Sequence, residues 1–192
     1  MKERTIEVNG VPVVIRPMDK DHVIDFCGPE RAKGRSDPAF QQFHRELMER
    51  YGNSAIVAWS QGKIVGFVNF SPSNVVTTFP LCPEHVPAEP QIDWPSRPSK
   101  TLGVGCVNVD PALGRKGIGH ALVEVLIDWA TEHGYTSIIA DANESAWWKP
   151  CRPFWEKLGF HVKSVEKFDK PREDGDTCAY IMEIMLSRTS QQ

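Results

Sequence analysis

The sequence predicts an α/β fold (mixed α+β) in which a central twisted mixed β-sheet of about seven strands is flanked by about four helices. Two observations support this prediction. Short runs of β-branched and apolar residues, typical of strands, alternate with longer segments whose apolar residues recur at helical spacing. The chain of 192 residues is long enough for one well-buried core and short for two, so we expect a single domain over residues 1–192.

The first half of the chain is expected to contain one strand, two helices and a hairpin, in that order. Residues 10–17 have the β-branched composition of a strand, and Asp19 or Asp21 can cap a short helix over residues 22–27. Residues 39–52 show apolar side chains at helical spacing and end at a glycine. Two apolar runs then flank a Gln-Gly-Lys turn, which is the pattern of a β-hairpin.

Residues 71–100 differ in composition from the rest of the chain. They contain seven prolines and show little apolar periodicity. Because proline interrupts helices and central strands, we expect a long insertion here without a helix or a central strand. Loops of this length in a compact domain are functional or disordered, so the segment is interpreted either as a lid or as a passive insertion.

The second half is expected to contain four strands and two helices. A strand over residues 101–111 precedes an almost fully apolar helix over residues 118–133, which must lie largely buried against the sheet. The remaining elements are a strand over residues 136–142, a short helix over residues 150–160, and two strands over residues 161–168 and 177–186. Each of the two helices is followed by a glycine that can stop it.

Composition excludes several classes of function. A net charge of −3 argues against a protein that binds nucleic acid through a basic surface. The five cysteines are scattered without the spacing of zinc ligands, and their number is odd, which argues against a disulfide scaffold. No signal peptide and no apolar run long enough for a membrane span is visible, so we expect a cytoplasmic protein without a membrane partner.

Residues 113–119, LGRKGIG, join a predicted strand to the first turn of the long apolar helix. Backbone N–H groups in such a turn have no intrahelical partner, and the helix dipole adds partial positive charge. Glycine permits positive φ and close approach of a ligand to the backbone. With Arg115 and Lys116 nearby, the turn is a candidate cradle for a pyrophosphate, and a plain structural turn is the alternative. Neither a P-loop nor a dinucleotide-binding motif is present.

The segments VNVDPALGRKGIGHALVEVLIDWA and RPFWEKLGFH resemble the matching segments of the GNAT superfamily of N-acetyltransferases, and the resemblance covers residues 10–186. It implies transfer of an acetyl group from acetyl-CoA to a primary amine of a small molecule or peptide. In that family the first segment is the pyrophosphate loop, Q/R-x-x-G-x-G/A. Gly117 and Gly119 match its glycines, Gly114 takes the Gln/Arg position, and Arg115 stands where a glycine is common.

The resemblance also implies a set of residues that bind acetyl-CoA. This set comprises Val107, Asn108, Val109, Gly114, Arg115, Lys116, Gly117, Ile118, Gly119, His120 and Trp155. The strand that ends at Val109 is expected to splay from the strand over residues 136–142. Backbone groups of Val107 and Val109 would then reach the amides of the pantetheine arm. Trp148 stands where relatives often have an Asn that contacts CoA.

Catalytic residues are harder to identify. Transfer to an amine requires a neutral amine, a polarised thioester carbonyl and a proton for the departing thiolate, and a carboxylate or His usually serves as the base. Many relatives have a Glu on the strand before the loop, whereas residues 101–109 contain none. Trp155 replaces the Tyr that protonates the thiolate in relatives. The remaining candidates for base or acid are Asp141, Asp93, His85 and Tyr180.

Two alternatives to an enzyme stay open. The missing Glu and Tyr favour a non-catalytic acyl-CoA-binding or sensing module of the same fold. An adaptor that binds protein through its tryptophans and the proline-rich segment is the second alternative, and it predicts no affinity for CoA. The sequence does not name the acceptor amine. A homodimer is compatible with the resemblance, since dimers are common in the family.

Overall fold

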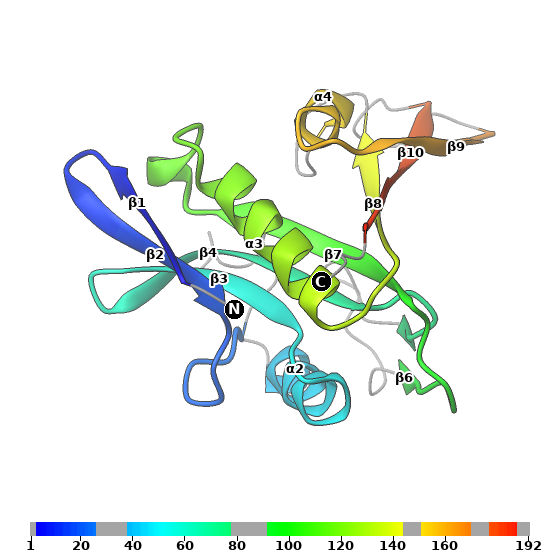
Figure 1. Cartoon of the computed structure of the whole chain (residues 1–192), viewed down its shortest axis with the longest axis horizontal. Coiled ribbons are helices and arrows are strands. Elements are labelled where there is room, and N and C mark those ends of the chain that lie inside the picture. Colours follow the sequence, from blue (N-terminus) through cyan, green and yellow to red (C-terminus); the bar gives the residue numbers. More distant parts are fainter. Residues whose placement is uncertain (1–2, 26–37, 78–91, 144–150, 170–176, 188–192) are drawn as a thin grey trace, which may run out of the picture.

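The computed structural model describes residues 3–25, 38–77, 92–143, 151–169 and 177–187 of the chain (Figure 1). One mixed sheet of eight strands, in the order β1-β2-β3-β4-β7-β8-β10-β9, forms the centre of the fold. β7 and β8 are parallel neighbours, and every other neighbouring pair in this sheet is antiparallel. The predicted mixed sheet is therefore confirmed, with one strand more than expected.

The strands of the sheet are β1 (Arg4–Val8), β2 (Val11–Pro17), β3 (Ala55–Ser60), β4 (Lys63–Pro72), β7 (Thr101–Val109), β8 (Ser137–Asn143), β9 (His161–Lys167) and β10 (Cys178–Met185). A separate two-stranded ribbon consists of β5 (Val76–Thr77) and β6 (Ile92–Asp93). The helices in the described residues are α2 (Pro38–Tyr51), α3 (Ile118–Glu132), α4 (Arg152–Glu156) and the 3₁₀ helix η2 (Pro111–Leu113).

The two faces of the sheet carry separate apolar clusters. The larger cluster combines the buried face of α3, including Leu122, with side chains of β3 such as Ile56. The other combines Met48 of α2 with Val57 of β3 and Phe67 of β4. Because successive side chains of a strand point to opposite faces, Ile56 and Val57 place α3 and α2 on opposite sides of the sheet.

The additional strand, β1, was not predicted from the sequence. It pairs with β2 through a tight turn in which Asn9 has φ 53° and Gly10 has φ 76°. Positive φ at both central residues is the signature of the Asn-Gly hairpin turn, whose twist matches that of the flanking strands. The strand expected over residues 10–17 is therefore the second strand of a hairpin, and β1 is the first.

The short helix expected over residues 22–27 is not found in the part of it that the structure describes. The carboxylate of Asp19 accepts the backbone N–H groups of Asp21 (3.0 Å) and His22 (2.8 Å) and also pairs with Arg16 (2.7 Å). These bonds close a local turn in place of a helix cap. Residues 26 and 27 lie outside the described residues.

The other helices and the hairpin were predicted correctly. α3 and α4 lie within the expected segments, and α2 begins one residue before its expected segment. The glycines that follow the three helices, Gly52, Gly134 and Gly159, all have positive φ. Within the described part of the chain, no helix is long and apolar enough to cross a membrane, and no group of three or more His, Cys, Asp or Glu side chains is placed to hold a metal ion.

A buried histidine, His44, lies on the α2 side of the sheet. Its side chain is 1 % exposed, and its Nδ1 lies 2.9 Å from Ser54 Oγ. Burial lowers the pKa of His44 from the ordinary 6.5 to about 3. The folded protein therefore holds this imidazole neutral at every pH near neutrality.

We predict that His44 makes the protein less stable in mild acid. Between pH 6.5 and pH 3 the unfolded chain protonates this residue and the folded chain does not, so stability falls with pH by about 2 kcal/mol at pH 5. Urea unfolding at pH 7 and pH 5 should show this loss, reduced in His44→Gln. His161→Gln, an exposed control, should retain it. Equal losses in the parent and His44→Gln would contradict the prediction.

Candidate active site

β7 and β8 separate toward their C-terminal ends (Figure 1). Their register begins at Thr101 and Ser137 and ends at Val104 and Ala140, although both strands continue beyond that point. Over its remaining length β7 stays paired with β4, and β8 stays paired with β10. The sheet therefore opens between β7 and β8, and the splay expected from the resemblance is confirmed.

A β-bulge on β7 lies at the start of this opening. The β4–β7 register passes from Asn69–Cys106 to Phe70–Val104, which leaves Gly105 unpaired. A methyl group on Gly105 would stand 3.0 Å from Asn69 Oδ1, so the Asn69 carboxamide occupies the space that a side chain at Gly105 would need. A bulge also changes the face of the sheet to which the following side chains of the strand point. As a result, Cys106 packs toward the α2 side of the sheet.

Beyond the bulge, β7 presents backbone groups to the opening. The N–H of Asp110 donates to Val65 O (2.8 Å), so the backbone at this position faces β4. Because the backbone groups of successive strand residues point to opposite edges, the N–H and C=O groups of Val107 and Val109 face the β8 edge, where no ladder continues. The valine side chains themselves pack against the α3-side cluster.

The loop after β7 is held by its own hydrogen bonds. Asp110 caps η2 by accepting the N–H of Ala112 (3.0 Å). Gly114 has φ −62° and donates its N–H to Pro111 O (3.2 Å). The Gly114 amide is therefore already used inside the loop, and its φ is one that any residue adopts.

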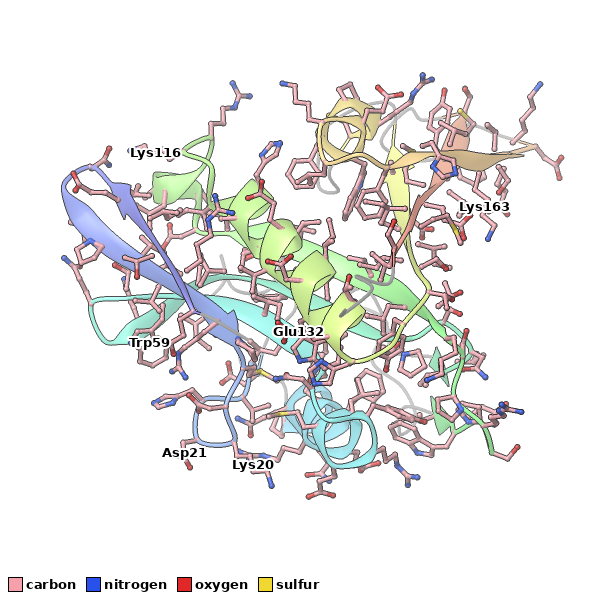
Figure 2. The ribbon with its side chains drawn as sticks, viewed as in Figure 1. Lys20, Asp21, Trp59, Lys116, Glu132 and Lys163 are labelled. Atoms are coloured by element: carbon pink, nitrogen blue, oxygen red, sulfur yellow. The ribbon has the colours of Figure 1, made fainter. Side chains whose placement is uncertain are left out.

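The left-handed positions of the loop are Arg115, with φ 60°, and Gly117, with φ 85°. Left-handed backbone is comfortable for glycine and costs a non-glycine residue about 1–2 kcal/mol. Arg115 thus adopts a backbone conformation that favours glycine, the residue expected here from the resemblance described under Sequence analysis. Both Arg115 and Lys116 are exposed. Figure 2 shows Lys116 and Glu132 at the two ends of α3, with Lys116 at the end that the loop enters.

α3 begins without a side-chain cap. Gly117 is its N-cap residue, and the N–H of Ala121 is the one that bonds back to Gly117 O (3.0 Å). The N–H groups of Ile118, Gly119 and His120 precede this first bond and so have no intrahelical acceptor. They form the set of donors at the positive end of the α3 dipole.

α4 approaches the first turn of α3 through Phe154, a residue that sequence reasoning missed. A methyl group on Gly119 would lie 3.4 Å from the Phe154 ring and 3.9 Å from Val107, and the His120 ring lies 4.8 Å from the Phe154 ring. The absence of a side chain at Gly119 therefore allows α3, β7 and α4 to pack closely at this point. The only sequence signal for Phe154 was its position beside Trp155 in the RPFWEKLGF segment.

Trp155 lies in the core. It is 1 % exposed and packs against Phe154 and Phe160, with ring centroids 5.1 and 4.9 Å away. Its indole Nε1 is buried and has no hydrogen-bond partner in the described residues. A buried donor without a partner carries a free-energy penalty, so this indole is held in place by packing.

The candidates for acid and base do not come together. Asp141 of β8 is exposed and stands opposite Ile181, whereas Tyr180 of β10 stands opposite Ala142. Neighbouring rows of a sheet face opposite sides, so Asp141 and Tyr180 lie on different faces. The ring of Tyr180 is covered by the Arg152 guanidinium at 5.4 Å. Asp93 is exposed on β6, and His85 and Trp148 lie outside the described residues.

A model of the acetyltransferase (GNAT) family matches residues 21–160. The chain is also similar to solved structures. For yncA from Salmonella typhimurium, solved with its cofactor acetyl-CoA, the identity is 16%, 93% of this chain and 96% of that chain are covered, and the TM-score is 0.65. An N-acetyltransferase from Staphylococcus aureus Mu50 is 17% identical, with 91% of this chain and 99% of that chain covered and a TM-score of 0.61.

The ribosomal-protein-S18-alanine N-acetyltransferase from Escherichia coli is 19% identical, with 94% of this chain and 97% of that chain covered and a TM-score of 0.55. No curated protein matches the chain. At these identities the solved structures establish a shared fold, whereas the family model covers most of the chain.

We predict that Arg115→Gly keeps or raises stability, because glycine removes a left-handed cost of about 1–2 kcal/mol and this exceeds its own entropic cost of about 0.5–1 kcal/mol. Lys116→Gly is the matched control, since Lys116 is an exposed neighbour without positive φ, and it should lose about 0.5–1 kcal/mol. Urea unfolding of both variants checks the difference. Equal losses would show that the loop relaxes around Arg115 at no cost.

Proposed function

The chain belongs to the acetyltransferase (GNAT) family, which uses acetyl-CoA as donor, and we propose that it is an N-acetyltransferase that acts on a primary amine of a small molecule or peptide. The observation that carries this proposal is the opening of the sheet beyond Val104 and Ala140, followed directly by the left-handed Gly117 at the start of α3. An extended arm fits between separated strands, and a diphosphate fits uncapped helical N–H groups.

In this proposal the donor substrate lies along β7 and the α3 N-terminus. The backbone groups of Val107 and Val109 face the opening and can bond the amides of the pantetheine arm. The N–H groups of Ile118, Gly119 and His120 take the diphosphate, with added positive charge from the exposed Arg115 and Lys116 of the same loop. Gly114 and Asn108 are not expected to bond the donor through their backbone N–H groups, because the Gly114 amide is bonded within the loop and the Asn108 backbone faces β4.

The proposed reaction is a direct transfer. The amine nitrogen forms a bond to the thioester carbonyl carbon, the carbon–sulfur bond breaks, and sulfur departs with the electron pair. The nitrogen loses one proton to a base, and the thiolate gains one. A backbone N–H of β7 at the opening would stabilise the developing oxyanion. Among the described carboxylates, Asp141 is the candidate base that flanks the opening, since it follows the last β7–β8 pair.

A second candidate function is a non-catalytic acyl-CoA-binding module. It is favoured by the absence of a Glu in residues 101–109 and by the complete burial of Trp155, which cannot release a proton. Incubation with acetyl-CoA and a broad panel of amines, followed by mass spectrometry of the products, separates the two functions. An acetylated amine formed at a rate above the protein-free control supports the enzyme. Binding of CoA without any product supports the module.

We predict that Gly117→Ala weakens CoA binding at least about tenfold, or about 1.4 kcal/mol, because a methyl group enters the closest approach to the diphosphate. Gly134→Ala is a matched control at the other end of α3. Both glycines have positive φ, 85° and 73°, and a methyl group on either meets nothing within 4 Å. Both variants should therefore lose similar stability, and calorimetry should find weaker CoA binding in Gly117→Ala alone. Unchanged CoA affinity of Gly117→Ala would refute the proposal that this loop binds the diphosphate.

We predict that Trp155→Phe retains most of the kcat and normal acetyl-CoA affinity. The indole N–H has no partner in the part of the chain that the structure describes, so its loss removes a buried unsatisfied donor while an apolar ring remains. Trp155→Tyr tests whether a phenolic acid raises the rate. Steady-state kinetics would contradict the packing role if Trp155→Phe binds acetyl-CoA normally and loses about 100-fold or more in kcat, since that is the range of a general-acid contribution.

A further inference from the structure

Two carboxamide oxygens beside the opening are unexplained by the fold. Asn69 Oδ1 and Asn108 Oδ1 are both buried, and neither has a hydrogen-bond partner in the described residues. Buried polar atoms are nearly always bonded, since an unpaired one keeps its desolvation penalty. Two such acceptors on adjacent strands therefore point to a donor that the described residues do not supply.

The register places both side chains on one face of the sheet. Asn69 of β4 stands opposite Cys106, and Asn108 of β7 stands opposite Phe67. Asn69 and Asn108 are thus diagonal neighbours, roughly 7–8 Å apart between Cα atoms. Phe67 and Cys106 both belong to the α2-side cluster, so the two asparagines also face the α2 side. This is the face opposite to α3.

Both asparagines also lie close to the opening, Asn108 on β7 itself and Asn69 on the neighbouring strand β4. The Asn69 carboxamide stands against Gly105, the bulged residue at which β7 begins to part from β8. Asn108 lies between Val107 and Val109, whose backbone groups face the opening. A group bound by the two carboxamides would therefore meet the β7 edge from the α2 side of the sheet.

We infer that Asn69 and Asn108 together bind the acceptor amine and orient it, an inference that rests on the proposed acetyltransferase function. A neutral primary amine has two N–H donors and one lone pair. Two carboxamide oxygens can accept the two N–H groups and leave the lone pair directed at the thioester carbon. Each side chain is half-buried, so its oxygen, unpartnered among the described residues, lies just beneath the part of the side chain that solvent reaches, where an entering amine would meet it.

The chemistry of the carboxamide fits this role. A carboxylate beside an amine would favour the protonated ammonium form, which has no lone pair and cannot attack. A carboxamide is uncharged and accepts N–H groups without that bias. The pair also distinguishes substrate classes, because a secondary amine offers one N–H group and leaves one oxygen unpaired. The site should therefore prefer primary over secondary amines.

The test uses n-butylamine and N-methylbutylamine as acceptors in mildly alkaline buffer. Asn69→Leu and Asn108→Leu should each raise the KM for n-butylamine about tenfold and reduce the preference over N-methylbutylamine by a similar factor. The acetyl-CoA Kd should stay within about twofold, which separates acceptor from donor binding. Ser71→Ala, on the same face of β4 beyond the bulge, is the control and should change neither.

A merely structural role predicts a different result. Replacing an unsatisfied buried oxygen by an apolar group keeps or raises stability, so both Leu variants should unfold at or above the parental urea midpoint. If they are destabilised and their acceptor selectivity is unchanged, the asparagines serve the fold and the inference is overturned.

A titration separates this inference from the proposed function. The side-chain amide NMR signals of Asn69 and Asn108, assigned with the two variants, should shift when n-butylamine is added to the CoA-loaded protein and not with n-butanol. Shifts without any acetylated product would retain the amine site and refute the acetyltransferase. Product with unmoved signals and unchanged selectivity would retain the enzyme and refute the amine site. Neither product nor shifts would refute both.

Discussion

The attachment of β7 to β4 in preference to β8 is the constraint on which the rest of the site depends. Gly66 allows this attachment, because a methyl group there would stand 2.9 Å from the carbonyl oxygen of Asn108. The bulge at Gly105 then turns β7 without breaking its ladder to β4. Since β8 stays paired with β10, the sheet beyond the Val104–Ala140 pair divides into two parts, each held by its own antiparallel ladders.

Local free-energy costs gather around this opening. Arg115 adopts left-handed backbone, and among the described residues the carboxamide oxygens of Asn69 and Asn108 find no donor and the Trp155 indole finds no acceptor. Each of these costs is of the order of 1–2 kcal/mol, and the surrounding apolar clusters stabilise the fold enough to hold them. Buried polar atoms without partners are typical of a ligand site when they lie in one region. Among the described residues, the further such atom is the Nε2 of His44, which belongs to the α2 packing.

Sequence patterns predicted the elements whose signals are local. α3 and the β3–β4 hairpin follow from apolar periodicity and a Gln-Gly turn, and the splay of β7 from β8 followed from the resemblance of two segments to a known family. β1 was missed because its strand pattern is weak and its Asn-Gly turn was not interpreted. Asn69 was missed for a different reason. A single polar residue in an apolar strand has meaning only once the bulge fixes the register, and the bulge depends on pairing with β7, some 35 residues away in the chain.

The division of the sheet into two faces also bears on how transfer would proceed without a strong acid or base. Under the proposed function, the donor lies along the α3 N-terminus and the acceptor reaches the β7 edge from the α2 side, so the two substrates meet through the opening. Orientation of this kind lowers the barrier by removing translational and rotational freedom before reaction. A CoA thiol is close to the ~8.5 pKa of an ordinary cysteine, so the thiolate is a tolerable leaving group near neutral pH. A fully buried Trp155 is compatible with such a mechanism, because positioning by Asn69, Asn108 and the β7 backbone would carry the catalysis that proton transfer carries in relatives.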